Sequence, residues 1–137
     1  MNVRVVYKSK KGHTKRLAEA IARGAGVQAE SVEAAAVSEP IDMLFIGGAL
    51  YAGNIDKALE NFLNNLTALQ VKKAVIFGTS AKGSAIDPIR ALLGNKHIAV
   101  VSDGFFCKGG FLWMNRGKPD EDDLMRAEAF AKGFVPG

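Results

Sequence analysis

Short apolar runs alternate along this chain with longer segments in which apolar residues recur at every third or fourth position. Val3–Tyr7 and Met43–Gly48 are runs of the first kind, and Ile55–Leu66 is the clearest segment of the second. A short apolar run is typical of a strand buried on both faces of a sheet, whereas the longer period is typical of an amphipathic helix. The alternation predicts an α/β protein, in which helices cover both faces of a parallel sheet.

The sequence predicts five strands, and the second is expected at the sheet edge because half of it is polar or alanine. These strands are Val3–Tyr7, Gln28–Ala34, Met43–Gly48, Lys73–Gly78 and His97–Phe105. Four helices lie between and after them: one that follows the first loop and ends at Gly24 and Gly26, and then Ile55–Leu66, Ile86–Leu93 and Pro119–Phe134. The most economical arrangement is a three-layer, doubly wound, five-stranded parallel sheet with strand order 2-1-3-4-5.

Length and composition predict a single domain that spans residues 1–137, long enough to bury a core without disulfides or a structural metal. The only cysteine, Cys107, cannot form an internal bridge, which fits a reducing compartment. The net charge is +4, but the basic residues are scattered along the chain, so no nucleic-acid partner is expected. No stretch reaches the roughly 18 apolar residues of a membrane span, and the first strand leaves no room for a signal peptide. We expect a cytoplasmic protein with no membrane partner; its oligomeric state stays open.

The loop after the first strand, Ser-Lys-Lys-Gly-His-Thr at residues 9–14, combines hydroxyls, a glycine and positive charge. Five cationic residues crowd around it: Lys8, Lys10, Lys11, Lys15 and Arg16. Like charges repel one another, so an anionic ligand is expected among them. The N–H groups of such a loop and of the helix that follows form a cradle for a phosphate, to which Ser9 and Thr14 can add hydroxyl donors. Alternatively, Thr14 caps the helix and the lysines are solvated.

Other classes of phosphate site fit these residues poorly. The chain has no G-x-x-x-x-G-K-[ST] run, which disfavours a nucleoside-triphosphate loop. A phosphatase of this topology would need a cysteine in the first loop. A phosphorylation-receiver domain would need acidic residues after the first strand and an aspartate after the third, where Lys8 and Gly48 stand. The glycines of Gly24–Ala29 follow a helix instead of opening one, so they do not form a dinucleotide fingerprint.

In a doubly wound sheet, ligands bind beyond the carboxyl ends of the strands where the winding reverses, here between the first and third strands. The loops at this edge resemble those of the flavodoxin family. S-K-K-G-H-T resembles the family's phosphate loop, G-G-A-L-Y-A-G-N at residues 47–54 its aromatic flavin loop, and G-T-S-A-K-G-S at residues 78–84 its second flavin loop. The resemblance spans essentially the whole chain, and the lack of an insertion in the fifth strand implies the short-chain type.

The resemblance implies that FMN is bound non-covalently. Ser9, Gly12, His13 and Thr14 would hold the phosphate, and Tyr51 would stack on the flavin ring. Alternatively, Tyr51 packs on its loop with the hydroxyl in water. The full set of cofactor-binding residues that the resemblance implies is Ser9, Lys10, Lys11, Gly12, His13, Thr14, Ala49, Leu50, Tyr51, Ala52, Gly53, Asn54, Thr79, Ser80, Ala81 and Gly83.

Two features depart from the family pattern. Lys11 and His13 stand where the family usually has threonine and asparagine; added positive charge favours an anion but can change the properties of the flavin. Many flavodoxins are acidic and dock on basic partners, whereas this chain is basic, so complementary docking would favour acidic ones.

The segment Phe105–Arg116 is unusually apolar for a loop. It is either a flap packed on the last helix or a cover for the flavin or a partner surface, through Phe111 or Trp113. Cys107 within it is expected to be a buried structural thiol instead of a redox partner of the flavin.

The leading interpretation is an FMN-binding protein that shuttles electrons between a reductase and an acceptor, with the chemistry supplied by the cofactor and no catalytic side chain. Whether the protein is itself an enzyme stays open. The alternative is a flavodoxin-like oxidoreductase that acts on a quinone or a porphyrinogen. A phosphate-binding module without flavin is a third class, because only Tyr51 argues for a ring.

Overall fold

The computed structural model describes residues 1–51, 54–80, 86–108 and 117–136, and the structural statements below concern these residues. The strands are β1 (Val3–Tyr7), β2 (Ala29–Ser31), β3 (Met43–Tyr51), β4 (Asn54–Ile55), β5 (Ala74–Ser80) and β6 (Phe105–Lys108). The helices are α1 (His13–Ala25), α2 (Lys57–Asn64), α3 (Ile86–Asn95) and α4 (Glu121–Lys132). No helix within these ranges is both long and apolar enough to cross a membrane.

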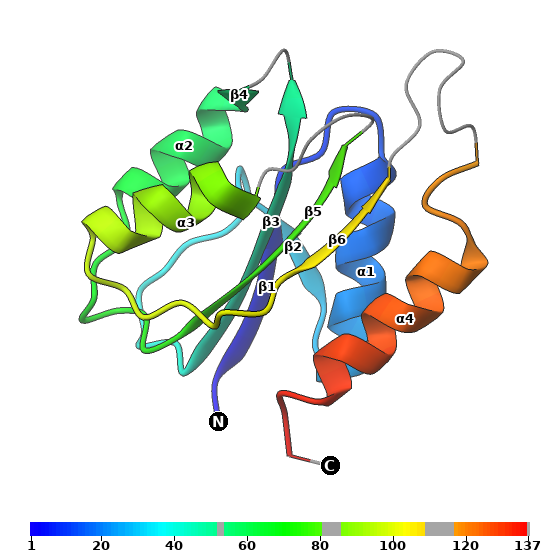
Figure 1. The fold of residues 1–137 in the computed structure, drawn as a ribbon. Helices are drawn as coiled ribbons and strands as arrows, with labels where there is room; N and C mark the ends of the chain where they lie inside the picture. Colours follow the sequence, from blue (N-terminus) through cyan, green and yellow to red (C-terminus); the bar gives the residue numbers. More distant parts are fainter. Residues whose placement is uncertain (52–53, 81–85, 109–116, 137) are drawn as a thin grey trace.

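Five parallel strands form the sheet, in the order β2-β1-β3-β5-β6 (Figure 1). The predicted order 2-1-3-4-5 is confirmed, since β5 and β6 are the fourth and fifth strands of this parallel set. The short β4 was not predicted. It pairs antiparallel with the end of β3, with Leu50 opposite Ile55 and Tyr51 opposite Asn54.

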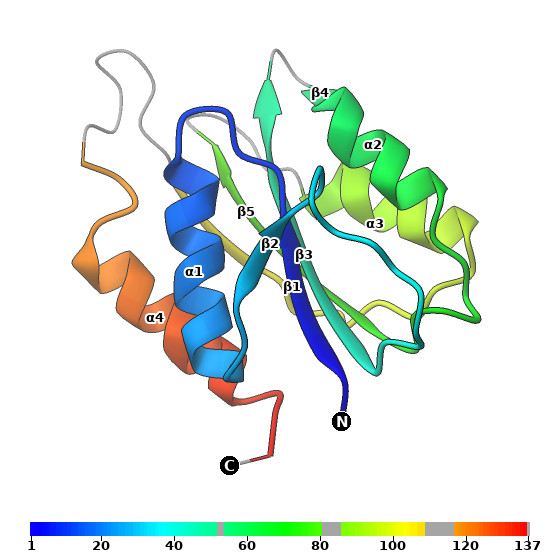
Figure 2. The same cartoon turned by 180° about the vertical axis from the view of Figure 1, so that it is seen from behind.

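Helices cover both faces of the sheet, as the alternating pattern predicts. Figures 1 and 2 show α1 and α4 on one face and α2 and α3 on the other. Consecutive strand residues point to opposite faces. Val5 and Phe45 therefore pack with α1 and α4, and Val6 and Ile46 pack with α2 and α3. The carboxyl edge of the sheet is left for loops.

The fifth strand differs from its predicted span, His97–Phe105. The regular strand begins only at Phe105, although Val100 forms an isolated bridge with Ala74. Phe105 pairs with Phe77, so five positions along this segment correspond to three along β5, and two residues bulge out of the pairing. Apolar composition alone carries no sign of such a bulge.

Helix boundaries also differ from the predicted ones. Gly24 does not end α1 but lies inside it, and Gly26 is the C-cap, with a φ of 75°. The helix predicted from Ile55 begins at Lys57, because Asp56 caps it and Ile55 belongs to β4.

Pro119 does not start α4. Asp120 is the N-cap and forms a reciprocal capping box with Asp123. Acidic residues fill the first turn of α4, where their negative charge complements the positive end of the helix dipole: Glu121, Asp122 and Asp123.

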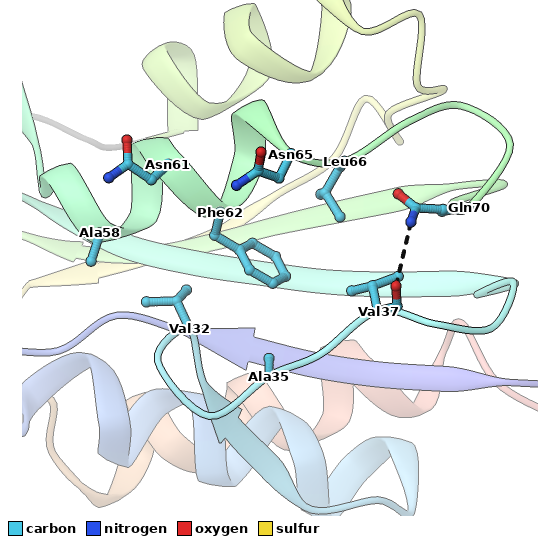
Figure 3. A pocket seen from close by; sticks show the side chains of 9 residues that line it. All are labelled: Val32, Ala35, Val37, Ala58, Asn61, Phe62, Asn65, Leu66 and Gln70. Atoms are coloured by element: carbon cyan, nitrogen blue, oxygen red, sulfur yellow. Dashed lines mark hydrogen bonds between the residues drawn. The ribbon is translucent and has the colours of Figure 1, made fainter.

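The connection from β2 to β3, residues 32–42, contains no helix. A hollow of about 410 Å³ lies between this connection and α2. Figure 3 shows the ring of Phe62 pointing from α2 into the hollow, toward Val32 and Val37. Gln70 closes one end by donating a hydrogen bond to the carbonyl oxygen of Val37, at 3.4 Å.

Candidate functional site

The carboxyl ends of β1, β3 and β5 lie side by side at one edge of the sheet. Tyr7 pairs with Gly47, and Ala49 pairs with Thr79. β2 lies on one side of β1 and β3 on the other, so the winding reverses between β1 and β3. The predicted site loops that follow β1, β3 and β5 therefore start from the same edge.

The loop after β1 is folded by its own backbone groups. The amide of Lys8 donates to the Gly47 carbonyl at 3.1 Å and thereby ties the start of the loop to β3. The amide of Gly12 donates to the Ser9 hydroxyl at 3.0 Å. Gly12 has a φ of 90°, a left-handed conformation that glycine adopts without a steric penalty. The Arg16 amide then bonds the Gly12 carbonyl at 3.0 Å, which starts the helix.

The start of α1 differs from that of the two other helices whose N-caps are described. Asp56 caps α2 and Asp120 caps α4, each through its carboxylate. The N-cap of α1 is Gly12, no side chain caps this helix, and its first turn carries no acidic residue. The alternative in which Thr14 caps the helix is therefore wrong. Uncapped N–H groups with the positive end of the helix dipole fit an anionic phosphate.

Thr14 lies in the first turn of α1 and makes a different contact. Its hydroxyl oxygen lies 2.6 Å from the hydroxyl oxygen of Thr79 near the end of β5. Both residues are only 1% exposed. This hydrogen bond joins two of the three predicted site loops at their bases.

Within the described part of the chain, carboxylates partner the side chains of Lys8 and Lys10. Lys8 pairs with Glu33, and Lys10 lies 3.6 Å from Asp56. The hydrogen bond from Lys8 is the main reason that the pKa of Glu33 is lowered. The charge that the sequence led us to expect among these lysines is thus supplied in part by the protein itself.

His13, the first residue of α1, contacts the segment that leads to α4. Its Nδ1 lies 3.2 Å from the carbonyl oxygen of Lys118, so Nδ1 carries the hydrogen and donates it. Burial lowers the pKa of His13, and the neighbouring charges of Arg16 and Lys11 lower it further. A neutral imidazole is therefore favoured at this position.

The structure brings four predicted site residues together at the start of α1: Ser9, Gly12, His13 and Thr14. Thr79 is hydrogen-bonded to Thr14. Ala49 is buried, and Leu50 is partly buried and packs against the core. Asn54 is exposed in β4. Tyr51 and Ser80 end their strands, and their side chains lie outside the description, as do the predicted site residues Ala52, Gly53, Ala81 and Gly83.

Part of the apolar segment Phe105–Arg116 is a strand instead of a loop. Phe105 lies in β6 and its ring is 5.6 Å from that of Phe130 in α4. Cys107 is buried, as expected, and burial is the main cause that raises the pKa of its thiol to about 12. Phe111 and Trp113 lie outside the described residues. In the part of the chain that is described, no cluster of three or more potential metal ligands occurs.

Sequence reasoning missed four contacts among the described residues of this site. They are the Thr14–Thr79 hydrogen bond, the contact of His13 with Lys118, and the ion pairs of Lys8 and Lys10 with carboxylates. One signal was available, because Asp56 directly precedes a helical run and is typical of an N-cap. The other contacts join residues far apart in the chain, and nothing in the local pattern indicates them.

Comparisons with known proteins agree with this geometry. A family model described as a flavodoxin domain matches residues 4–113. An uncharacterized protein of Methanocaldococcus jannaschii is 26% identical over 150 residues, which cover 98% of this chain and 99% of that protein.

Solved structures of low sequence identity share the fold. A flavodoxin from the domain Archaea matches with a TM-score of 0.75 at 19% identity, covering 97% of this chain and 95% of that one. A flavodiiron core from Synechocystis sp. matches with a TM-score of 0.77 at 23% identity, covering 98% of this chain but 35% of that one. Since the family model covers most of the sequence, the chain belongs to the flavodoxin domain family.

Proposed function

We propose that this protein binds FMN non-covalently and carries electrons between a reductase and an acceptor protein. Membership of the flavodoxin family supports the general part of this proposal, namely that the protein is a flavodoxin-like redox protein that binds flavin. The observation that carries the proposal is the uncapped start of α1 at the edge where β1, β3 and β5 end. A phosphate-bearing cofactor there would have its other end beside the loops after β3 and β5.

The residues of the first loop would hold the phosphate group. The hydrogen bond between Ser9 and Gly12 closes a turn directly before α1. This turn would leave the first N–H groups of α1 pointing toward the phosphate. Lys11, Lys15 and Arg16 would add positive charge near the anion, and His13 would stay neutral while it donates to Lys118. Stacking of Tyr51 on the flavin ring remains a prediction from the sequence.

When bound, FMN would supply the redox chemistry, and the chain would position it and control access to it. The acceptor and the reductase are proposed to dock at this edge. The positive residues around the first loop favour partners with acidic surfaces, because complementary charge speeds encounter and fixes orientation. The proposed setting is the cytoplasm, consistent with a reduced Cys107.

Absorption spectra of the purified protein before and after FMN is added test the proposal. The bound flavin should show a shifted visible spectrum and quenched fluorescence, and after chemical reduction it should pass its electrons to an added one-electron acceptor. A protein that leaves FMN fluorescence unchanged would overturn the proposal. Turnover of a quinone with NAD(P)H and no added reductase would instead support an enzyme.

A further inference from the structure

Thr79, which the resemblance places among the cofactor-binding residues, has one of the two buried threonine side chains in the described part of the candidate site. It is 1% exposed and its hydroxyl lies 2.6 Å from the hydroxyl of Thr14, which is equally buried. The two residues are 65 positions apart in the chain, one near the end of β5 and the other in the first turn of α1.

Breaking the hydrogen bond between these two hydroxyls would be energetically costly, so both side chains are held in place. A buried hydroxyl that loses its partner keeps the full penalty of its removal from water. In the described part of the chain, no buried side-chain nitrogen or oxygen lacks a hydrogen-bond partner. Neither threonine can therefore turn away without leaving the other unpaired.

The bond matters for α1 because the N-cap of this helix contributes no side-chain hydrogen bond. Gly12 provides no side chain, and the helix has no side-chain cap. Among the described residues, the side chains of His13 and Thr14 hydrogen-bond the first turn of α1 to other elements, and the His13 contact is partly exposed. The hydrogen bond to Thr79 therefore helps to fix the first N–H groups relative to the sheet edge.

We infer that Thr79 is a positioning residue for the phosphate group of the cofactor. It acts through Thr14, by holding the first turn of α1 against the end of β5, and it does not itself touch the phosphate. The inference rests on the proposed function, because it assumes that a phosphate binds at this helix start.

Riboflavin makes the inference testable, because it has the flavin ring of FMN but no phosphate. Dissociation constants for FMN and riboflavin are measured by fluorescence quenching with the full chain and with Thr79→Val and Thr79→Ser. Thr79→Val keeps the shape of the side chain but leaves Thr14 unpaired. This variant should raise the dissociation constant for FMN about tenfold and that for riboflavin by less than about twofold. Thr79→Ser, which keeps the hydroxyl, should restore the preference for FMN.

Val75→Ala is the matched control. Val75 is a fully buried residue of the same strand, and it packs with α1 and α4. This variant should unfold at lower urea concentration while the ratio of the two dissociation constants stays as in the unaltered protein. If Thr79→Val does not fold, Thr79→Cys, a much weaker hydrogen-bond donor than serine, is compared with Thr79→Ser.

The outcomes separate the two levels of the proposal. An unaltered protein that binds FMN no more tightly than riboflavin would overturn the phosphate site itself, and the role of Thr79 with it. An unaltered protein that prefers FMN, combined with a Thr79→Val variant that keeps the same preference, would overturn only the role of Thr79.

Discussion

Gly24 of α1 lies directly against the backbone of Glu128 in α4. A β-carbon added at Gly24 would lie 2.2 Å from the Glu128 carbonyl oxygen and 3.0 Å from the β-carbon of Ala131. Neither neighbour is the flexible end of a long side chain, so neither can move aside cheaply. The two helices that cover this face of the sheet can approach so closely only because residue 24 has no side chain (Figure 2).

Gly24→Ala should therefore destabilise the fold by about 3 kcal/mol, as overpacking of a tight contact does, despite the higher helix propensity of alanine. Urea denaturation gives the free energy of unfolding. Gly94→Ala is the control, because Gly94 lies in α3 with open space around it. That change should stabilise the protein by about 0.5–1 kcal/mol. Equal effects of the two substitutions would contradict the close contact.

Gly12→Ala tests the left-handed turn at the start of α1. Apart from the chain neighbours of Gly12, no atom of the described residues lies within 4 Å of the added β-carbon. The expected loss of about 1–2 kcal/mol therefore comes from strain at the φ of 90°. Relaxing this strain would move the first N–H groups of the helix, so FMN should bind more weakly.

Gly26→Ala has the same strain at the other end of α1, with a φ of 75° and open space. It should cost similar stability and leave the FMN dissociation constant unchanged. Equal losses of FMN affinity in both variants would show that general destabilisation, and not the phosphate loop, is responsible.

The capping box of α4 should make stability depend on pH. The side chain of Lys118 and the amide of Asp123 hold the pKa of Asp120 at about 2, below its ordinary 3.8. Since the charged carboxylate is the stabilising form, its contribution is complete above pH 3.8 and is lost as the pH falls toward 2.

Asp120→Ala should lower the melting temperature near neutral pH, and the difference from the unaltered protein should shrink as the pH falls from about 4 to 2. Asp120→Asn keeps an acceptor for the Asp123 amide but removes the charge. Near neutral pH its melting temperature should lie between those of Asp120→Ala and the unaltered protein. Thermal unfolding over a pH series measures both. A difference that persists unchanged at pH 2 would contradict the role of the carboxylate.

Cys107 should be inert while the protein is folded. It is buried, and burial raises the pKa of its thiol to about 12, so almost no reactive thiolate is present at pH 8. A disulfide reagent that releases a coloured thiol should react at least about a hundredfold more slowly with the folded than with the urea-unfolded protein. Rapid reaction in the folded state would contradict this expectation and favour a redox role for Cys107.

Much of the fold follows from the period of the apolar residues. Runs such as Val3–Tyr7 and Met43–Gly48 are buried on both faces, so composition predicts both strand and parallel pairing. The structure differs from the sequence-based prediction where contacts between distant parts of the chain determine the local structure. Gly24 looks like a helix end because glycine often is one, and only the approach of Glu128 shows why it lies inside a helix.

The candidate site could be predicted only in part. Gly12 and Ser9 lie in a local turn, so the pattern of the loop predicts their role. The partner of Thr14 lies 65 residues away on β5, and no local signal identifies it. The same reason hides the contact of His13 with Lys118.

The most direct test of the central claim is to locate the bound phosphate. Amide chemical shifts of the isotope-labelled full chain, measured with and without FMN, report which residues the ligand approaches. The account predicts that the largest shifts fall on residues 9–16 and that riboflavin reproduces them poorly. Shifts confined to the hollow between α2 and residues 32–37, or no shifts at saturating FMN, would contradict it.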